Sequence, residues 1–189
     1  MKILRFSALL MTLALAACAP WSAIDPDHRE IAVRDDYVLQ APSGWVRRNY
    51  DVFDVFLSRD GPLLNFIAID REKHAHELPN TKRTTNADLL PQDVAELVIA
   101  EQKASESRAA FSVLSNRPAM IGGRPAARVH TRWKTERGLP IERLTYALVD
   151  EQGRLAFIYE APGLVYFPKG LADFEAMVKS VAFLPTKTP

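Results

Sequence analysis

The sequence of 189 residues contains one cysteine, Cys18, so no disulfide can form within the chain. It also lacks an excess of either charge, because 24 Lys and Arg stand against 23 Asp and Glu. The near balance argues against a basic protein that binds nucleic acid. Hydrophobic residues (48%) and charged residues (25%) occur at ordinary globular frequencies, which excludes wholesale disorder. The chain is therefore expected to fold around its own core without disulfides or a Cys-rich metal site.

The N-terminus has the features of an export signal. Lys2 and Arg5 precede an apolar run over residues 6–17, which is shorter than the ~20 residues needed to span a bilayer. The run ends in Leu15-Ala-Ala-Cys18 and resembles the lipobox of bacterial lipoproteins. This resemblance implies cleavage before Cys18, followed by acylation of its sulfur and its new amine. The alternative is an ordinary Ala-x-Ala signal with an unrelated cysteine.

Lipidation of Cys18 has consequences for partners and location. The lipid chains would attach the protein to a membrane, and the folded part would contain no thiol for catalysis or redox chemistry. In lipoproteins of this type, Asp after the cysteine favours retention at the inner membrane, but this chain has Ala19. The resemblance therefore implies an envelope protein on the periplasmic face of the outer membrane rather than the inner membrane.

The patterning divides the chain into four parts. We expect a signal peptide over residues 1–17, the lipidated Cys18 with a flexible tether over 18–35, one domain over 36–184, and a tail over 185–189. Short β patterns precede a helix with Asp88 as its expected cap, and a three-stranded meander covers 126–160. A closing helix is expected to bury Phe174 and Val178 against the sheet, with Tyr146 and Phe157 buried on one sheet face. This order predicts an α+β fold: an antiparallel sheet of about six strands with helices packed on both faces.

Three segments resemble the Mog1/PsbP-like family: Tyr37–Trp45 (YVLQAPSGW), Ile121–Ala126 (IGGRPA) and Phe174–Phe183 in the closing helix. The resemblance covers roughly residues 36–184 and implies an antiparallel sheet covered by helices. Members of this family are non-catalytic; one binds a small GTPase, and others are extrinsic subunits of photosystem II. The expectation for this chain is a binding or adaptor role, by analogy of fold.

Motifs for catalysis and for metal binding are absent from the sequence or incomplete. It contains no Gly-x-Ser-x-Gly elbow, no phosphate-binding glycine loop and no His-Glu-x-x-His. His74-Ala-His76-Glu77 is the most metal-like segment, but a zinc site needs a further ligand from elsewhere. We interpret it as part of a solvated polar loop, and expect neither a metal nor a cofactor.

The meander concentrates basic residues at one end. A two-residue turn at Gln152-Gly153 would place Leu148 opposite Phe157. A two-residue turn at Arg137-Gly138 would place Val129 opposite Tyr146 and Arg132 opposite Arg143. The same face would carry Arg128, His130 and Glu160. One interpretation is a solvated sheet end, where Glu160 offsets charge and Arg stems cover apolar surface. The other is a basic recess for an anionic ligand or an acidic loop of a partner.

The sequence leaves three function classes open. The first is a non-catalytic interaction module that docks onto another envelope protein. The alternative is a carrier or sensor of a small anionic or amphiphilic ligand, bound at the candidate residues Arg128, His130, Arg132, Arg143 and Glu160. The third is an enzyme using a His130–Glu160 acid/base pair with Thr145. It ranks last because no oxyanion site or metal accompanies the pair.

Overall fold

The computed structural model describes residues 20–49 and 52–185. The predicted signal peptide and Cys18 lie outside the described residues. Within the described ranges, no helix is both long and apolar enough to cross a membrane.

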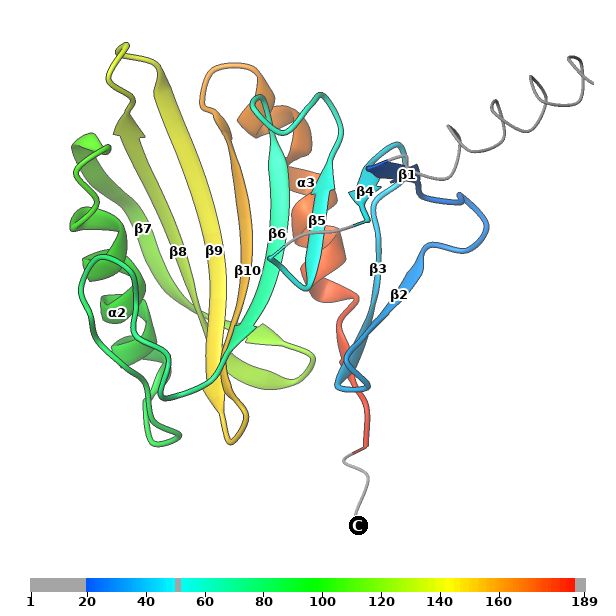
Figure 1. Ribbon diagram of the computed structural model, residues 1–189, viewed down its shortest axis with the longest axis horizontal. Coiled ribbons are helices and arrows are strands. Elements are labelled where there is room, and N and C mark those ends of the chain that lie inside the picture. The colour runs from blue at the N-terminus through cyan, green and yellow to red at the C-terminus, as the bar shows by residue number, and fades with distance from the viewer. Residues whose placement is uncertain (1–19, 50–51, 186–189) are drawn as a thin grey trace, which may run out of the picture.

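The described chain forms two antiparallel sheets and two helices (Figure 1). The large sheet has eight strands in the order β1-β4-β5-β6-β10-β9-β8-β7, and the small sheet has three, in the order β11-β3-β2. The elements are, in sequence, β1 (Trp21–Ala23), β2 (Glu30–Val33), β3 (Tyr37–Gln40), β4 (Val46–Arg48), β5 (Val55–Ser58), β6 (Phe66–Glu72), α2 (Pro91–Lys103), β7 (Ala109–Ile121), β8 (Arg124–Lys134), β9 (Pro140–Asp150), β10 (Gly153–Pro162), α3 (Tyr166–Lys179) and β11 (Ala182–Phe183).

The mixed α+β class and the antiparallel sheet agree with the prediction, but two details differ. The sheet has eight strands rather than about six, because the short β1 and β4 extend it at one edge. The predicted helical layers on both faces also do not form. α2 packs mainly against β7, β8 and β9 on one side, and α3 contacts β10 and β3 on the other side, which it shares with the small sheet. Neither helix therefore forms a layer over a whole face of the sheet.

Residues 20–35 do not form the predicted flexible tether. β1 pairs with β4, and β2 pairs with β3, with Ile31 opposite Leu39. Alternate residues of β2, Ile31 and Val33, are buried in the core. The folded part therefore begins well before residue 36, because a four-residue strand with two buried side chains is fixed by its packing.

The β9–β10 hairpin keeps the predicted faces although its turn differs. Asp150 pairs with Gly153, so the two-residue loop is Glu151-Gln152. Phe157 consequently lies opposite Tyr146 rather than Leu148. The shift is two residues, and an even shift leaves each side chain on its original side of the sheet.

The β8–β9 hairpin has a different register from the predicted one, with consequences for the candidate site. Lys134 pairs with Pro140, which leaves a five-residue loop over 135–139. The Gly138 amide donates to the Thr135 carbonyl at 2.8 Å within this loop. The register is shifted by one residue relative to the prediction. Each β8 side chain therefore shares its side of the sheet with the β9 side chains that were expected on the opposite side. Val129, for example, lies opposite Thr145 and not Tyr146.

Two apolar cores result from this alternation. On one side, Phe174 and Val178 of α3 are buried against Tyr146, Phe157 and Tyr159, as predicted. On the other, α2 packs against alanines and Val129. This second core consists of Val94, Ala95 and Val98 of α2 and of Ala127, Val129, Ala147 and Ala156 of the strands. Small side chains on the strands let the helix approach the sheet closely.

The α2 helix begins at Pro91, which is pre-organised for the first helical position. The residue before it, Leu90, takes the cap position in place of the predicted Asp88. The Leu90 amide donates to the Asp93 carboxylate at 2.9 Å, so a side chain inside the first turn fixes the entry to the helix. This start sets which side of α2 faces the sheet, with Val94, Leu97 and Val98 buried.

Candidate functional site

The hairpin register divides the predicted basic cluster between the two sides of the sheet. Arg132 pairs with Glu142, and Arg143 pairs with Thr131. Arg128, His130 and Arg132 therefore share one side, as predicted, but Arg143 is not opposite Arg132. This is a correction to the sequence interpretation, and its cause is the odd number of residues in the 135–139 loop.

On the side that α3 covers, two of the predicted residues are engaged internally. The Arg128 guanidinium donates to Glu175 of α3 at 2.8 Å and to the Tyr146 hydroxyl at 2.9 Å. Arg132 donates to Glu142 at 2.5 Å. These charge-assisted bonds connect α3 and β9 to β8, so these residues have structural partners in place of the open recess considered above.

His130 has the most constrained environment of the predicted residues. Its Nε2 lies 2.8 Å from the Glu142 carboxylate, and its ring stacks on Phe167 with centroids 4.9 Å apart. Burial lowers the pKa of His130, against the opposing effect of Glu142. The imidazole is therefore favoured in its neutral form at neutral pH.

The considered His130–Glu160 acid/base pair is not formed. His130 pairs with Glu142, and Glu160 is bound by the guanidinium of Arg143. Thr145 lies on the side that faces α2, because it pairs with Val129 across the β8–β9 ladder. These three groups do not converge on one point where a reacting atom could sit.

The predicted metal-like segment also has other contacts. His74 Nδ1 lies 3.0 Å from the Thr85 hydroxyl, and His76 Nε2 lies 4.0 Å from Glu72. Among the residues that the structure describes, no three His, Cys, Asp or Glu side chains are placed to hold a metal ion.

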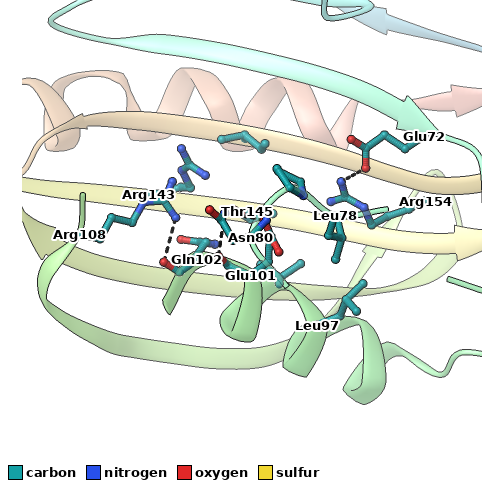
Figure 2. Close-up of a pocket in the computed structure, with 13 residues that line it drawn as sticks. Glu72, Leu78, Asn80, Leu97, Glu101, Gln102, Arg108, Arg143, Thr145 and Arg154 are labelled. Atoms are coloured by element: carbon teal, nitrogen blue, oxygen red, sulfur yellow. Dashed lines mark hydrogen bonds and ion pairs between the residues drawn. The ribbon is translucent and has the colours of Figure 1, made fainter. Parts of the chain in front are cut away.

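A pocket that the sequence did not indicate lies between α2, the 73–90 loop and strands β9 and β10 (Figure 2). Its volume is about 190 Å³. Figure 2 shows Arg108 and Arg143 at one end and the Glu72–Arg154 ion pair at the other. Apolar side chains contribute the wall between them. These are Leu78, Pro79, Leu97, Val98 and Ile158. An apolar pocket with a few convergent polar groups is the usual form of a small-molecule site.

Most polar groups of this pocket have hydrogen-bond partners, but the Thr145 hydroxyl and the Arg108 guanidinium can form further hydrogen bonds. Gln102 accepts a hydrogen bond from Thr131 at 2.7 Å, and Glu101 accepts several from the loop residues Asn80 and Thr81. The hydroxyl of Thr145 is buried and has no hydrogen-bond partner in the described chain. Arg108 donates to the Gln102 carbonyl at 3.3 Å but is in no ion pair found among the described residues.

The environment of Arg108 disfavours its charge. Its guanidinium lies over the Trp133 ring, 4.5 Å from the centroid, and Arg143 approaches the same ring at 5.4 Å. Burial, together with the positive charge of Arg143, lowers the pKa of Arg108 to about 10. The side chain remains cationic at neutral pH, so this end of the pocket has an incompletely compensated positive charge.

The residues of this pocket have no common signal in the sequence. Arg108 lies in the short link between α2 and β7, and Leu78 lies in a loop of mostly polar residues. Neither position has a periodicity or motif. Only the packing of the 73–90 loop against α2 brings them together, and the Leu78–Pro79 pair within the polar loop was the one available signal.

No family model and no curated protein matches the sequence. Among solved structures, the chain is similar to cyanobacterial PsbP from Synechocystis, with a TM-score of 0.53 and 13% identity over 86% of this chain and 91% of that one. It is also similar to LpqN of Mycobacterium tuberculosis, described as involved in cell envelope biogenesis, with a TM-score of 0.46 and 17% identity over 82% of each chain. It is similar, too, to a Pseudomonas aeruginosa protein of unknown function, with a TM-score of 0.49 and 13% identity over 84% of this chain and 97% of that one.

The comparison with PsbP concerns the class of fold. The likeness to PsbP confirms the predicted PsbP-like α+β architecture, with a large antiparallel sheet and two helices. At this level of identity the similarity concerns the fold alone.

Proposed function

We propose that the protein is a lipid-anchored lipoprotein of the cell envelope that acts as a non-catalytic interaction module. Cys18 would hold it at the periplasmic face of the outer membrane, and the outer edge of β7 would dock onto an envelope protein. The proposal rests on one observation, the exposure of β7 along almost its whole length.

The β7 strand is long and open. It has 13 residues, of which only Ile121 is buried. It pairs with β8 and is the last strand of the sheet, so no other strand of the described chain pairs with its outer edge. Val113 and Leu114 are each 41% exposed beside this edge. Unpaired amides and carbonyls with adjacent apolar side chains suit the addition of a partner strand.

The irregularities of β7 favour a short partner segment over a second copy of this chain. The ladder with β8 shifts register between Ala109 and Ser112 and again between Val113 and Ser115. Pro118 cannot donate a backbone hydrogen bond. Such bulges and prolines prevent two long edges from pairing continuously. The occupant that fits is an extended segment of a different envelope protein, a few residues long.

The side-chain partners described above support a role without catalysis. His130 and Glu160, the pair considered for acid/base chemistry, are each bound to a different group. A docking module needs no reactive pair, only a surface that a partner can cover.

Site-specific photo-crosslinking in intact envelopes tests the docking surface. A photoreactive residue replaces Leu114 beside the β7 edge, and in a matched control it replaces Ser22 in β1, the strand at the opposite edge. The proposal expects crosslinks from position 114 to one envelope protein, mapped by mass spectrometry to an extended segment. Equal crosslinking from both positions, or none from position 114, would contradict it.

The anchor has its own test. Cys18→Ser removes the only thiol of the chain, so metabolic labelling with palmitate should disappear and the protein should accumulate as a precursor or in the soluble fraction. Equal label in the variant would overturn the lipobox interpretation.

The pocket beneath α2 favours a second candidate function, a carrier or sensor of a small anionic or amphiphilic ligand. The basic end of the pocket includes Arg143, one of the predicted binding residues, but joins it to Arg108 rather than to Arg132. Binding of any small amphiphile to the purified chain, lost when Leu97→Trp fills the pocket, would support this function. Binding unaffected by Leu97→Trp would contradict it.

A further inference from the structure

We propose that the pocket between α2 and strands β9–β10 binds a small amphiphile with a singly charged anionic head, its head at Arg108, Arg143 and Thr145. The hydrocarbon part would lie against Leu78 and Leu97. This inference rests on the second candidate function and names its ligand class.

The strongest observation is the hydroxyl of Thr145. The residue is 3% exposed, lines the pocket and has no hydrogen-bond partner for Oγ1 in the described chain. A buried hydroxyl without a partner destabilises the fold, because the loss of its hydrogen bonds to water is not compensated. An oxygen acceptor of a ligand would remove this cost by taking its hydrogen bond.

Among the described residues, the carboxylates around the pocket are bound by other groups, and Arg108 has no carboxylate partner. Glu72 is bound by Arg154, and Glu160 by Arg143. Glu101 accepts hydrogen bonds from the Asn80 and Thr81 amides at 2.8 and 2.9 Å. Each acidic group is therefore committed, while Arg108 retains donors beyond the one that it gives to the Gln102 carbonyl.

Arg143 can contribute a second donor. Its Nε and Nη2 both bind Glu160 Oε2, which leaves Nη1 available. The guanidiniums of Arg108 and Arg143 lie 4.5 and 5.4 Å from the centroid of the same Trp133 ring, so their like charges repel. A carboxylate between them would relieve this repulsion and accept from both. A doubly charged head is disfavoured, because Arg143 is already paired with Glu160 and the Glu101 carboxylate lines the same pocket.

The size and lining of the pocket limit the rest of the ligand. A volume of about 190 Å³ corresponds to roughly six water molecules at ~30 Å³ each. It is below the ~300 Å³ at which sites for drug-sized molecules begin. Leu78 and Leu97 are each 3% exposed and Ile158 completes the wall. A medium-chain carboxylate fits these limits, and a long acyl chain does not.

Calorimetry on the full chain held in lipid nanodiscs tests the proposal, with empty nanodiscs as the blank. The probes are octanoate, octanol, octylamine and palmitate. We expect octanoate to bind at least about tenfold more tightly than octanol or octylamine, because one charge-assisted hydrogen bond contributes about that factor. Arg108→Gln and Thr145→Val should each weaken octanoate binding, and Thr145→Val preserves the side-chain shape.

The control is Arg132→Gln, a loss of the same charge on the other side of the sheet, which should leave octanoate binding unchanged. A diazirine-bearing octanoate used on the wild-type chain gives a readout that does not depend on how the variants fold. Its label should map to α2 or the 73–90 loop.

The outcomes separate this inference from the second candidate function. Octanol or octylamine binding as tightly as octanoate would overturn the anionic head while leaving a ligand-binding pocket. Loss of binding in Arg132→Gln equal to that in Arg108→Gln would also contradict the head position. Failure of all four probes to bind, with no label in the pocket, would overturn both.

Discussion

Arg71 and Asp36 form an ion pair that joins the two sheets. Arg71 lies on β6 of the large sheet, and Asp36 precedes β3 of the small sheet; their Nη2 and Oδ2 atoms are 2.7 Å apart. The same guanidinium donates to Asp150 at 2.6 Å. The side chains of Arg71 and Asp36 are 6% and 8% exposed, so the pair is nearly shielded from water.

Removal of Arg71 should therefore destabilise the fold strongly. Arg71→Met leaves Asp36 without its buried counter-charge, and such a loss costs about 3–5 kcal/mol. Urea denaturation of the variant measures this free energy of unfolding. Lys169→Met, which breaks the more exposed pair with Asp60, should cost less than about 1 kcal/mol. Similar effects of the two substitutions would mean that Arg71 does not join the sheets.

Phe174 should be a second site of high sensitivity. It is fully buried, and the centroid of its ring lies 5.9 Å from that of Tyr146 and 5.6 Å from that of Tyr159. Phe174→Ala creates a cavity beneath α3 and should cost about 3–5 kcal/mol. Leu164→Ala, at a position that is 84% exposed, should have almost no effect. A small shift of the denaturation midpoint for Phe174→Ala would show that α3 is peripheral.

His130 should make stability depend on pH. Its pKa in the folded state is lowered, first by burial, relative to about 6.5 in the unfolded chain. The neutral imidazole therefore contributes stability above pH ~6.5, and this contribution is lost as the pH falls through the lower folded pKa. Denaturation of wild type and His130→Gln between about pH 7.5 and 5 should show a steeper loss for wild type. Parallel curves would exclude the linkage.

Arg132 and Arg143 should act independently, because they contact Glu142 and Glu160 on different sides of the sheet. Arg143→Gln breaks a pair whose side chains are 17% and 19% exposed, and should cost more than Arg132→Gln, whose own side chain is 51% exposed. The two losses should add to within about 0.5 kcal/mol in the double variant. A coupling above about 1 kcal/mol would place both residues in one network.

The sequence sufficed for those parts of the fold that local patterns determine. The spacing of Phe174 and Val178 identified the buried side of α3, and alternation identified Tyr146 and Phe157. The strand count and the role of residues 20–35 depend on pairing between distant segments, such as β1 with β4. A three-residue strand has too few residues to show a period, so its pairing could not be foreseen.

The candidate site was less predictable because it depends on one loop. Arg137-Gly138 favours a two-residue turn, whereas the structure has a five-residue loop closed by Thr135. This difference of one residue in the β8–β9 register places Arg143 on the opposite side of the sheet from Arg132. Arg143 consequently lines the same pocket as Arg108. The basic character of the meander was visible in the sequence, but the location of its unpaired charge requires the packing of α2.

In the proposed function, β7 offers its outer edge to a partner strand. Hydrogen–deuterium exchange, read by mass spectrometry from the chain in intact envelopes and from the purified chain, tests this directly. We expect edge amides of Ala109–Ile121 to exchange at least about tenfold more slowly in envelopes, and those of β1 at the opposite edge to be unchanged. Equal exchange of β7 in both preparations would contradict it.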